Sequence, residues 1–576
     1  MSMIRRRMHT PKLKFEIFTV GKESKTNICL CYLRDSVSPG VLSKVRKRLN
    51  DLQIDTVLAA GYISPQLVRR NSHFIFSGVG LSERPDTVCG KINEGRVAVI
   101  IDGTPNVLIV PHLFIENFQS FDDYAFRPFY ATFTRWLKFF SFFLAVFLPG
   151  FYVSATTFHP ELLPEALMLK IAQSEATTPF PVMLEAIVIH FLYEIMREAG
   201  LRVPQPLSNA VSIVGALVIG ETAVTSGLVG APTLMVIALT ATASYVTPNL
   251  YGPVTIMRFI FIIVGGTLGF WGLALCLMVL LVNICAEMVY RIPYSAPISP
   301  FHLRSMRDVL IRASWRVLAR DVEMVQNMPG SEIKNYRSKR EATMTQKRYC
   351  ISAGQLFAIL FVNRSVIMLT HNTLLGGGEN MMDNILSALL ALGLNFVLIL
   401  PLYFLHRRNP QENILDSGER LVGKPGLILL AVFYGLYFMA IDSYYLSFFQ
   451  IFLNNIMEPL MPVWLIALTF IAVVCYAAYQ GIEAVARTAG FALAIIVIGM
   501  VWIGVALLPK IQMINYDPFL YNGPKQTIVG TTLFLARSTG FTTMALLLPR
   551  VNGKKKLKFC IWNVSIYGLM ISYCWE

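Results

Sequence analysis

The sequence predicts a mainly α-helical protein that crosses a membrane many times and carries a small α/β domain at its N-terminus. Of the 576 residues, 55% are apolar and only 15% are charged, whereas soluble proteins average about 45–50% apolar and about 25% charged residues. The mean hydropathy is +0.54, and the apolar residues gather in runs of about 20, the length that spans a bilayer. This balance excludes an ordinary soluble enzyme.

The net charge is strongly positive, with 50 Lys and Arg against 35 Asp and Glu. A basic chain can bind nucleic acid by releasing counterions from phosphate. Here most basic residues lie beside apolar runs, which is the loop bias that orients membrane proteins. One such group comprises Arg550, Lys554, Lys555, Lys556 and Lys558. We therefore expect contact with membrane lipid and no binding of nucleic acid.

Residues 1–135 are predicted to form a cytoplasmic α/β domain, because the charged N-terminus has no apolar run after it and is not a signal peptide. Residues 26–33 predict a buried strand, Ser38–Asp51 an amphipathic helix, and Arg96–Asp102 a second strand. The sequence Asp102-Gly103-Thr104-Pro105 then predicts a hairpin turn, since glycine takes a positive φ without strain.

The sequence offers no catalytic motif. The nine cysteines contain no C-x-x-C pair, which argues against a disulfide framework. Cys29 and Cys31 share one face of the first strand, where a buried pair is a simpler interpretation than metal ligation. Walker loops, G-x-S-x-G elbows and paired catalytic carboxylates are missing from the N-terminal sequence. We expect no enzymatic activity, no metal and no cofactor.

Residues 136–290 contain the first group of apolar runs. These runs are Phe139–Phe158, Leu207–Thr225, Ala231–Thr247 and Val254–Met288. The last is long enough for one tilted helix or for two short helices, because several glycines permit a break. Those glycines are Gly265, Gly266, Gly269 and Gly272. The number of spans stays open at about four to six.

Four ionisable side chains of this block are candidate intramembrane polar residues, three of them within the otherwise apolar segment Pro179–Gly200, which also carries Arg197, and one within the second run. They are Glu185, His190, Glu194 and Glu221. A charge at membrane depth is costly unless it faces protein or water. Two interpretations stay open for the segment, a helix that lies in the membrane interface and a helix with a buried polar role.

Four hydroxyl side chains fall on one face of the third run, because they are spaced seven, four and three residues apart. They are Thr233, Thr240, Ser244 and Thr247. An unpaired hydroxyl in hydrocarbon costs free energy. Either neighbouring helices pack closely on this hydroxyl stripe, which the residues alone favour, or the stripe lines a water-filled path.

Several motifs occur in a fixed order between residues 14 and 320. They are Ser82-Glu83-Arg84-Pro85-Asp86, Glu94-Gly95-Arg96-Val97-Ala98, Asp102-Gly103-Thr104-Pro105, Thr156-Thr157-Phe158-His159 and Ser212-Ile213-Val214-Gly215-Ala216-Leu217-Val218-Ile219-Gly220. Together they resemble the GerA-type A subunit of bacterial spore germinant receptors. Family A subunits usually carry a further N-terminal subdomain before the stretch that matches Phe15–Lys25, and we expect this chain to lack it.

The resemblance implies an A subunit that oligomerises in the spore inner membrane as a nutrient-gated channel and releases ions when a nutrient binds a partner B subunit. It also shifts the interpretation of the hydroxyl stripe. Rings of small hydroxyls from several subunits can carry partly hydrated monovalent cations, so we predict that Thr233, Thr240, Ser244 and Thr247 line the pore.

Residues 291–350 hold twelve Arg and Lys against five acids and are predicted to be a cytoplasmic linker. The linker is either a solvated tether or a patch on anionic lipid. A second group of apolar runs follows, and the charges of its loops fit seven spans. The runs lie near residues 353–372, 382–405, 425–452, 461–479, 486–508, 526–549 and 559–575.

Two motifs in this part, Ile351-Ser352-Ala353-Gly354-Gln355-Leu356-Phe357 and Gly481-Ile482-Glu483-Ala484-Val485-Ala486-Arg487, resemble the B subunit of the same receptors, a relative of amino-acid permeases. The resemblance implies two inverted helical repeats, with substrate held where the first and sixth helices break. These helices correspond to the runs 353–372 and 526–549. An amino-acid carboxylate could meet exposed helix amides there.

Polar residues interrupt both runs, and they are the candidate substrate-binding residues: Asn363, Arg364, Ser365, Arg537, Ser538, Thr539 and Gly540. Arginines that only pack between helices or at the interface are the alternative. The family B subunit is expected to have ten spans, whereas this chain ends at Glu576 within the seventh. We therefore expect residues 351–576, the C-terminal part of this chain, to be a truncated inverted-repeat permease fold that lacks most of its second repeat.

The sequence thus predicts four parts, 1–135, 136–290, 291–350 and 351–576. We expect a multi-pass subunit of a germinant receptor, with an ion-channel region fused to a partial nutrient-sensing domain. A secondary amino-acid transporter and a structural membrane assembly factor are the alternatives. The expected partners are further copies of the A-subunit region, B- and C-type receptor subunits, monovalent cations and a small nutrient such as an amino acid.

Overall fold

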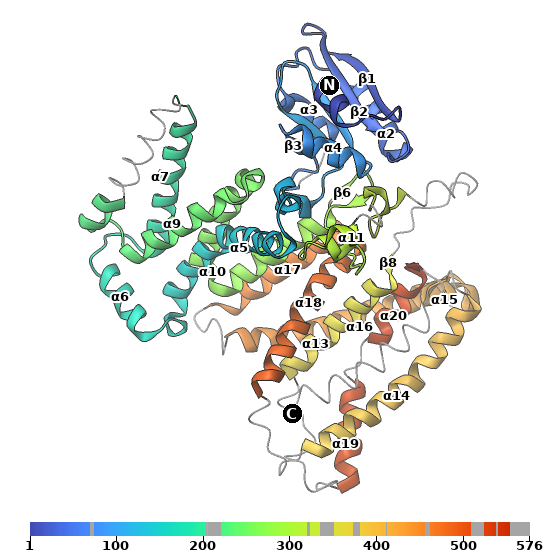
Figure 1. Cartoon of the computed structure of the whole chain (residues 1–576). Helices are drawn as coiled ribbons and strands as arrows, with labels where there is room; N and C mark the ends of the chain where they lie inside the picture. Colours follow the sequence, from blue (N-terminus) through green and yellow to red (C-terminus); the bar gives the residue numbers. More distant parts are fainter. Residues whose placement is uncertain are drawn as a thin grey trace. The chain divides into compact units, whose positions relative to one another are not determined.

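The chain divides into two compact units in the computed structural model. The first comprises Met1–Pro297 and His302–Arg340 with Asn454–Val473, and the second comprises Ile298–Phe301, Glu341–Leu453 and Val474–Glu576. Helices dominate both units (Figure 1), as the sequence predicts. The structure describes residues 1–68, 74–202, 204, 220–318, 323–333, 351–371, 381–409, 412–454, 461–507, 523–536 and 540–552.

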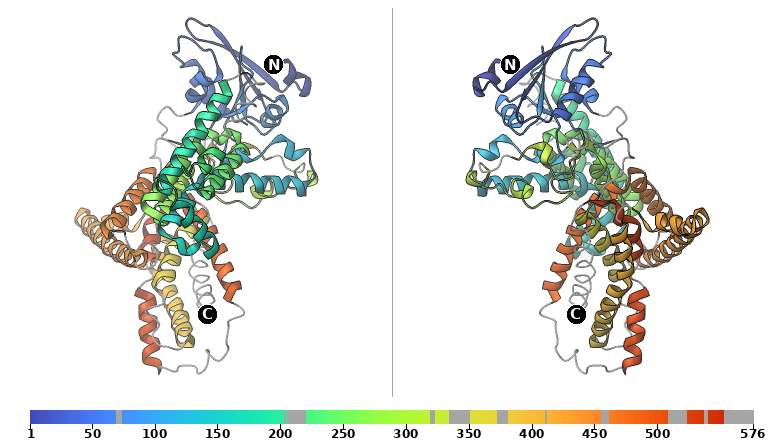
Figure 2. Two further views of the ribbon diagram at one scale, coloured as in Figure 1. Left: turned by 90° about the vertical axis from the view of Figure 1, so that its left-hand side faces the viewer. Right: turned by 90° about the vertical axis from the view of Figure 1, so that its right-hand side faces the viewer.

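An antiparallel sheet of five strands forms the N-terminal domain, in the order β1-β2-β4-β5-β3. The strands are β1 Leu13–Val20, β2 Thr26–Leu33, β3 Gly80–Ser82, β4 Val97–Ile101 and β5 Val107–Val110. The long β1–β2 hairpin, dark blue in Figure 2, pairs Leu13 with Leu33 and Val20 with Thr26. The two predicted strands are confirmed as β2 and β4, and Gly103 turns the chain toward β5 with a φ of 78°.

Helices cover both faces of this sheet, and they are α1 Ser2–Arg7, α2 Pro39–Asn50, α3 Ala60–Leu67 and α4 Pro85–Asn93. Successive side chains of a strand point to opposite faces. Leu30 of β2 therefore packs in the core with α2 and α3. Its neighbour Cys31 packs in a second core with Ile4 of α1 and Ile92 of α4. The amphipathic helix predicted over Ser38–Asp51 is α2.

The rest of the first unit is mainly helical, with α5 Pro128–Phe158, α6 Glu165–Glu175, α7 Val182–Arg202, α9 Ala231–Tyr245 and α10 Tyr251–Ala286. Short elements connect them: η1 Phe114–Phe118, η2 Phe121–Tyr124, η3 Pro160–Leu162, η4 Pro248–Leu250, β6 Met288–Val289, β7 Ile292–Pro293, η5 Ser305–Asp308, α11 Trp315–Leu318 and η6 Val325–Asn327. Gly269, with a φ of 59°, kinks α10, so the last run of this block is two helices joined across a bend.

The backbones of α5 and α10 approach closely at two glycines. A Cβ atom added to Gly265 would lie 2.6 Å from the carbonyl oxygen of Gly150, and one added to Gly150 would lie 2.5 Å from the carbonyl oxygen of Phe261. Small residues allow membrane helices to pack at such short range. These glycines therefore set the crossing of the two long helices.

The second unit consists almost wholly of helices: α13 Ala353–His371, α14 Met381–Arg408, α15 Ile414–Val422, α16 Lys424–Phe452, α18 Ile482–Leu507, α19 Gly523–Ala536 and α20 Gly540–Leu547. The helix α17 Val463–Gln480 belongs to the first unit up to Val473 and to the second from Val474. The turn η11 Leu548–Arg550 leads to β9 Val551–Asn552, which pairs in parallel with β8 Ile351–Ser352. Leu356 and Leu360 of α13 share a core with Met544 of α20.

Among the described residues, six helices are long and apolar enough to cross a membrane. They are Pro128–Phe158, Pro248–Ala286, Ile385–Arg408, Lys424–Phe452, Val463–Gln480 and Ile482–Ala506. Two shorter apolar helices, Ala231–Tyr245 and Ala353–Asn363, accompany them. The predicted run 559–575 and most of the run Leu207–Thr225 lie outside the described residues. The chain is a mainly helical multi-pass membrane protein with a small N-terminal sheet domain.

Candidate functional site

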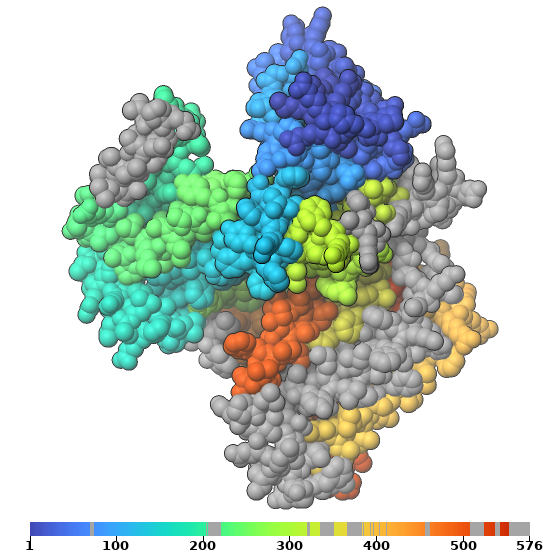
Figure 3. All heavy atoms as spheres, in the orientation of Figure 1, coloured from blue at the N-terminus to red at the C-terminus, as the bar shows by residue number. Residues whose placement is uncertain are grey.

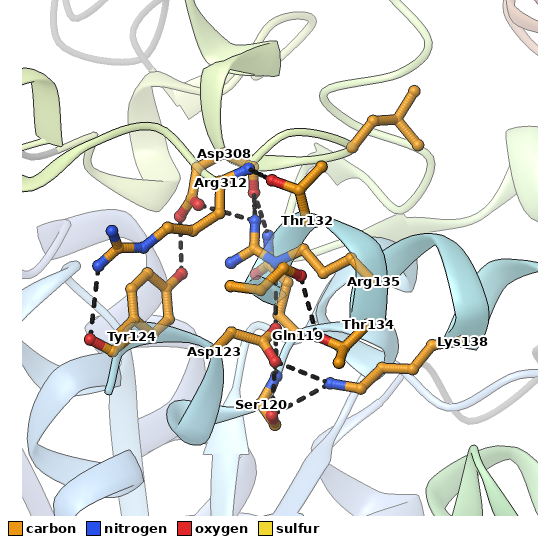
Figure 4. Close-up of polar contacts among 12 residues, drawn as sticks. Gln119, Ser120, Asp123, Tyr124, Thr132, Thr134, Arg135, Lys138, Asp308 and Arg312 are labelled. Atoms are coloured by element: carbon orange, nitrogen blue, oxygen red, sulfur yellow. Dashed lines mark hydrogen bonds and ion pairs between the residues drawn. The ribbon is translucent and has the colours of Figure 1, made fainter. Parts of the chain in front are cut away.

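A group of ion pairs joins three segments of the first unit: the turn η2, the first turns of α5, and η5 with the residues after it (Figure 4). We name it the junction cluster, and it consists of Asp123, Tyr124, Arg135, Lys138, Asp308 and Arg312. Arg135 is fully buried. Its Nε donates to Asp123 Oδ2 at 3.0 Å, and its Nη1 donates to Asp308 Oδ1 at 2.8 Å.

Further hydrogen bonds close the junction cluster. Lys138 Nζ lies 3.0 Å from Asp123 Oδ1, and the Tyr124 hydroxyl donates to Asp308 Oδ2 at 2.6 Å. Burial by itself would raise the pKa of Asp123, but Lys138 and Arg135 more than offset it, so that pKa lies below its ordinary value. Burial and the adjacent Asp308 raise the pKa of Tyr124. The aspartate therefore stays ionised and the tyrosine stays neutral at physiological pH.

Arg312 is the second buried arginine of the junction cluster, with 2% of its surface exposed. Its guanidinium carbon lies 5.7 Å from the ring centre of Tyr124 and 5.0 Å from that of Trp315. Its backbone N–H donates to the hydroxyl of Thr132 at 3.1 Å. The residues after η5 are thus fixed to the start of α5 by both main-chain and side-chain contacts.

Sequence reasoning missed the junction cluster. A signal was present, because Arg135 and Lys138 lie one turn apart just before the apolar run of α5. Asp308, the partner of Arg135, lies 173 residues from it, and no spacing rule connects such positions. The ion pairs fasten the turn η2 and the residues around η5 to the start of α5, so the junction cluster links the N-terminal domain to the membrane helices.

The motif Glu94-Gly95-Arg96 has a structural role in the N-terminal domain. Arg96 pairs with both Glu94 and Glu116 below the surface. Lys91 Nζ also lies 3.1 Å from Glu116 Oε2. Gly95 has a φ of 87°, and a Cβ atom there would lie 2.6 Å from the Ser36 carbonyl oxygen. The motif thus supplies a turn that only glycine fits and a buried ion pair.

Two of the predicted intramembrane polar residues are buried on α7. Glu185 is 1% exposed, and its Oε2 accepts from the Gly230 N–H at 3.4 Å. His190 is fully buried, and neither ring nitrogen has a hydrogen-bond partner among the described residues. Their burial supports the interpretation of α7 as a helix with a buried polar role. Glu221 lies exposed on a short helical stretch, residues 220–225.

Glu194 is the centre of a polar network between α7 and α10. Its Oε1 accepts from the Tyr251 hydroxyl at 2.7 Å, and its Oε2 accepts from Arg197 Nε at 3.2 Å. Arg258, which is fully buried, lies with its Nη1 3.6 Å from Glu194 Oε1 and donates from Nε to the Ala145 carbonyl. Arg258 was not singled out from the sequence, although a lone arginine in a long apolar run is a recognisable signal.

Three residues of the hydroxyl stripe, Thr233, Thr240 and Ser244, lie on α9, and Thr247 follows this helix just before η4. All four side chains are at most 2% exposed. Thr233 is 3.2 Å from the Tyr152 hydroxyl of α5. Thr240 and Ser244 donate to carbonyls of their own helix, Val236 and Ala241. The stripe is therefore packed within the chain. Its pore-lining role, including that of Thr247, stays a prediction.

The residues expected to bind substrate are only partly described. The structure does not have the expected break in the first permease-like helix, because α13 runs unbroken through Asn363, Arg364 and Ser365. Ser365 is 8% exposed and donates to the Phe361 carbonyl at 2.9 Å, so the local backbone is satisfied within the helix. Arg537, Ser538 and Thr539 lie outside the described residues, and Gly540 is the first residue of α20.

Metal and thiol chemistry find no support among the described residues. No three His, Cys, Asp or Glu side chains in that part of the chain lie close enough to hold a metal ion. Burial raises the pKa of Cys31 to about 12, so this thiol is protonated and unreactive at neutral pH. The polar clusters described above are thus the candidate functional groups.

Comparison with known proteins matches both halves of the chain. The family model of the Bacillus/Clostridium GerA spore germination protein matches residues 1–323, and a spore permease model, described as spore germination protein, matches residues 351–574. Spore germination protein KA of Bacillus subtilis is 42% identical over 54% of this chain and 58% of its own length. Spore germination protein GerLA of Bacillus cereus is 34% identical over 56% of this chain and 66% of its own length.

Among solved structures, the chain is similar to the N-terminal domain of the A subunit of the Bacillus megaterium spore germinant receptor GerK3. It is 37% identical, covers 20% of this chain and 89% of that chain, and gives a TM-score of 0.17. The chain spans less than two thirds of the length of the curated relatives named above. The chain belongs to the Bacillus/Clostridium GerA spore germination protein family, with an A-subunit-like region at residues 1–323 fused to a spore permease-like domain at residues 351–574.

Proposed function

We propose that this chain is a subunit of a nutrient germinant receptor in the spore inner membrane. Its A-subunit-like region oligomerises and conducts monovalent cations, and its permease-like domain senses a small nutrient such as an amino acid. B-type and C-type receptor subunits are its partners, and it catalyses no chemical reaction. The observation that carries the proposal is the presence of both receptor domain types in a single polypeptide.

Buried polar groups in the A-subunit-like region support ion conduction. Charged side chains deep in a helical membrane domain mark ion pathways more often than they serve packing alone. Glu194 and Arg258 are such groups, and they lie between α7 and α10 with the hydroxyl of Tyr251. Their rearrangement would give the region two states without a change of fold.

The experiment is cation flux from liposomes that contain the full chain. We expect potassium efflux that depends on one member of an amino-acid panel and that falls several-fold in Glu194→Gln. Glu198→Gln is the matched control, because Glu198 lies one turn further along α7 and its side chain is exposed. Both variants must first show unfolding temperatures close to that of the wild type.

The alternatives give different results in the same liposomes. Saturable uptake of a labelled amino acid without cation efflux would contradict a channel and favour a secondary transporter. A structural assembly factor would show neither flux. Cation efflux that does not depend on any of the nutrients tested would still support a channel, but it would contradict a sensing role of the permease-like domain.

A further inference from the structure

The first half of α5 presents an exposed aromatic face. Phe129 is 90% exposed, and the same face carries Phe133, Trp136 and Phe140, each 59–64% exposed. Their spacing of four, three and four residues keeps them on one side of the helix. The buried Arg135 and the Lys138 of the junction cluster lie on the other side.

The segment after η5 extends this aromatic face. The Trp136 indole N–H donates to the Leu310 carbonyl at 3.0 Å, and the junction cluster holds the neighbouring Asp308 and Arg312 against α5. Leu310, Ile311 and Trp315 are 42–60% exposed, yet they lie outside every candidate membrane helix. Figure 3 shows the cyan start of α5 side by side with the yellow-green residues that follow β7.

The length of α5 places this face at the edge of the bilayer. A helix of 31 residues is about 46 Å long, whereas the hydrocarbon core is about 30 Å thick. The apolar run Phe139–Phe158 fills that core, so Pro128–Lys138 extends into the headgroup zone. Aromatic side chains are enriched at this level because their rings tolerate the boundary between lipid and water.

The charges around the face suit an anionic membrane surface. Arg127 directly precedes α5 and Arg316 directly follows Trp315, and both are exposed. Three acidic side chains nearby are already paired with arginines. The exposed Asp122 lies 3.0 Å from Arg84, and Asp123 and Asp308 form ion pairs with Arg135 inside the junction cluster. Basic residues near a membrane surface each gain about 1 kcal/mol from anionic lipids.

We propose that the aromatic residues of α5 together with Leu310, Ile311 and Trp315 dock into the headgroup region of a leaflet that contains anionic phospholipid. The segment His302–Leu318 then returns to the membrane surface and is not a free tether. The face is continuous with the membrane-spanning part of α5, and the junction cluster holds both segments at one depth. This inference rests on membrane insertion of α5 and not on the proposed channel activity.

Tryptophan quenching by brominated phospholipids tests the depth of the segment. The full chain is placed in vesicles of phosphatidylcholine and phosphatidylglycerol whose bromines lie either near the headgroup or near the chain end. We expect the quenched emission to fall in Trp315→Phe, with a larger loss for shallow than for deep bromines. Leu58→Trp is the water-side control, because Leu58 is 68% exposed on the N-terminal domain and a tryptophan there should escape both quenchers.

Trypsin cleavage supplies a readout that does not depend on tryptophan. We expect cleavage after Arg304 and Arg316 to be several-fold slower in vesicles with phosphatidylglycerol than in vesicles of phosphatidylcholine alone. Equal cleavage rates and unquenched Trp315 would overturn the proposal. Efficient cross-linking of Ile311→Cys between two copies, with Trp315 still unquenched, would also overturn it, because a second copy would then cover the face.

Discussion

The apolar helices of the two regions differ in how much of their surface the chain itself buries. In the A-subunit-like region, Pro128–Phe158 and Pro248–Ala286 have 44% and 50% of their most apolar window buried. In the permease-like region, Lys424–Phe452 and Ile482–Ala506 have 0% buried in the corresponding window. All four are apolar enough to span a membrane. Composition therefore identifies a membrane helix without indicating whether protein or another surface covers it.

Glycines show the same difference at the level of single atoms. Gly150 and Gly265 bring the backbones of α5 and α10 so close that a Cβ atom would collide. A Cβ atom added to Gly435 or Gly499, on α16 and α18, would meet no atom within 4 Å. The glycines of the first region are packing sites, whereas those two are positions where a larger side chain fits freely.

The largest effect that we predict comes from filling one of the close approaches. Gly265→Leu must push α5 and α10 apart, and we expect a loss of about 3 kcal/mol or more in the free energy of unfolding. Gly499→Leu should leave the stability within about 0.5 kcal/mol. Denaturant unfolding in detergent micelles measures both. Equal losses in the two variants would contradict the difference in packing between the regions.

The second prediction compares a buried ion pair with an exposed one. Arg135→Gln removes one of the two cations that pair with the buried Asp123, together with the pair to Asp308, which should cost about 1.5–3 kcal/mol. Arg420→Gln breaks the pair with Glu412 in the permease-like region, where half of the arginine side chain is exposed, and should cost about 0.2–1 kcal/mol. The unfolding midpoints of the two variants show which substitution costs more stability. A partial recovery in the double variant with Asp308→Asn is expected, because Arg135 is the cation that pairs with Asp308.

Local sequence patterns predict much of the fold. The alternation of apolar residues predicts β2, the amphipathic period predicts α2, and Gly103 predicts the turn to β5, because each of these depends on residues within a few positions. The glycines of the last run in the first block permitted a break, but only the structure shows that it falls at Gly269.

Contacts between distant residues could not be predicted in this way. Asp308 lies 173 residues after Arg135 in the sequence. Their pairing therefore depends on where the end of α10 lies in the folded protein. The expected break at Asn363–Ser365 is wrong because polar side chains alone do not open a helix. Ser365 bonds to the carbonyl four residues before it, so the helix satisfies the hydroxyl without breaking. Thr233, Thr240 and Ser244 of the hydroxyl stripe are buried on α9, but Thr247 lies beyond the end of this helix. The contact of Thr233 with Tyr152 of α5 could be found only from the tertiary structure.

Acid gives a third prediction, which concerns the N-terminal domain. Burial disfavours the charged form of Glu116, but Arg96, Lys91 and His112 more than offset this and hold its pKa well below the ordinary value. A carboxylate with a lowered pKa contributes stability above the unfolded-state pKa of about 4.3, and the contribution is lost as the pH falls through the folded-state pKa. We expect Glu116→Gln to cost about 2 kcal/mol at pH 7.

The difference between wild type and Glu116→Gln should then shrink as the pH falls below about 4. Near-UV circular dichroism, recorded as a function of pH for both proteins, measures this difference in stability. Asp35→Asn is the control, because Asp35 pairs with Lys12 at the surface, where solvent screens the interaction. The control should have a smaller effect at pH 7. A difference between wild type and Glu116→Gln that does not depend on pH would contradict the role of the ion pair.

The smallest effect that we predict separates the two interpretations of the hydroxyl stripe. Thr240→Val keeps the shape of a fully buried side chain and removes a hydroxyl that donates to its own helix at 2.6 Å. We expect a loss below about 1 kcal/mol and unchanged cation flux, since the stripe packs within the chain. Thr242→Val, on the exposed side of α9, should change neither the stability nor the cation flux. Altered cation selectivity in Thr240→Val at unchanged stability would instead place the stripe in the ion path, because a packed hydroxyl cannot contact a permeating cation.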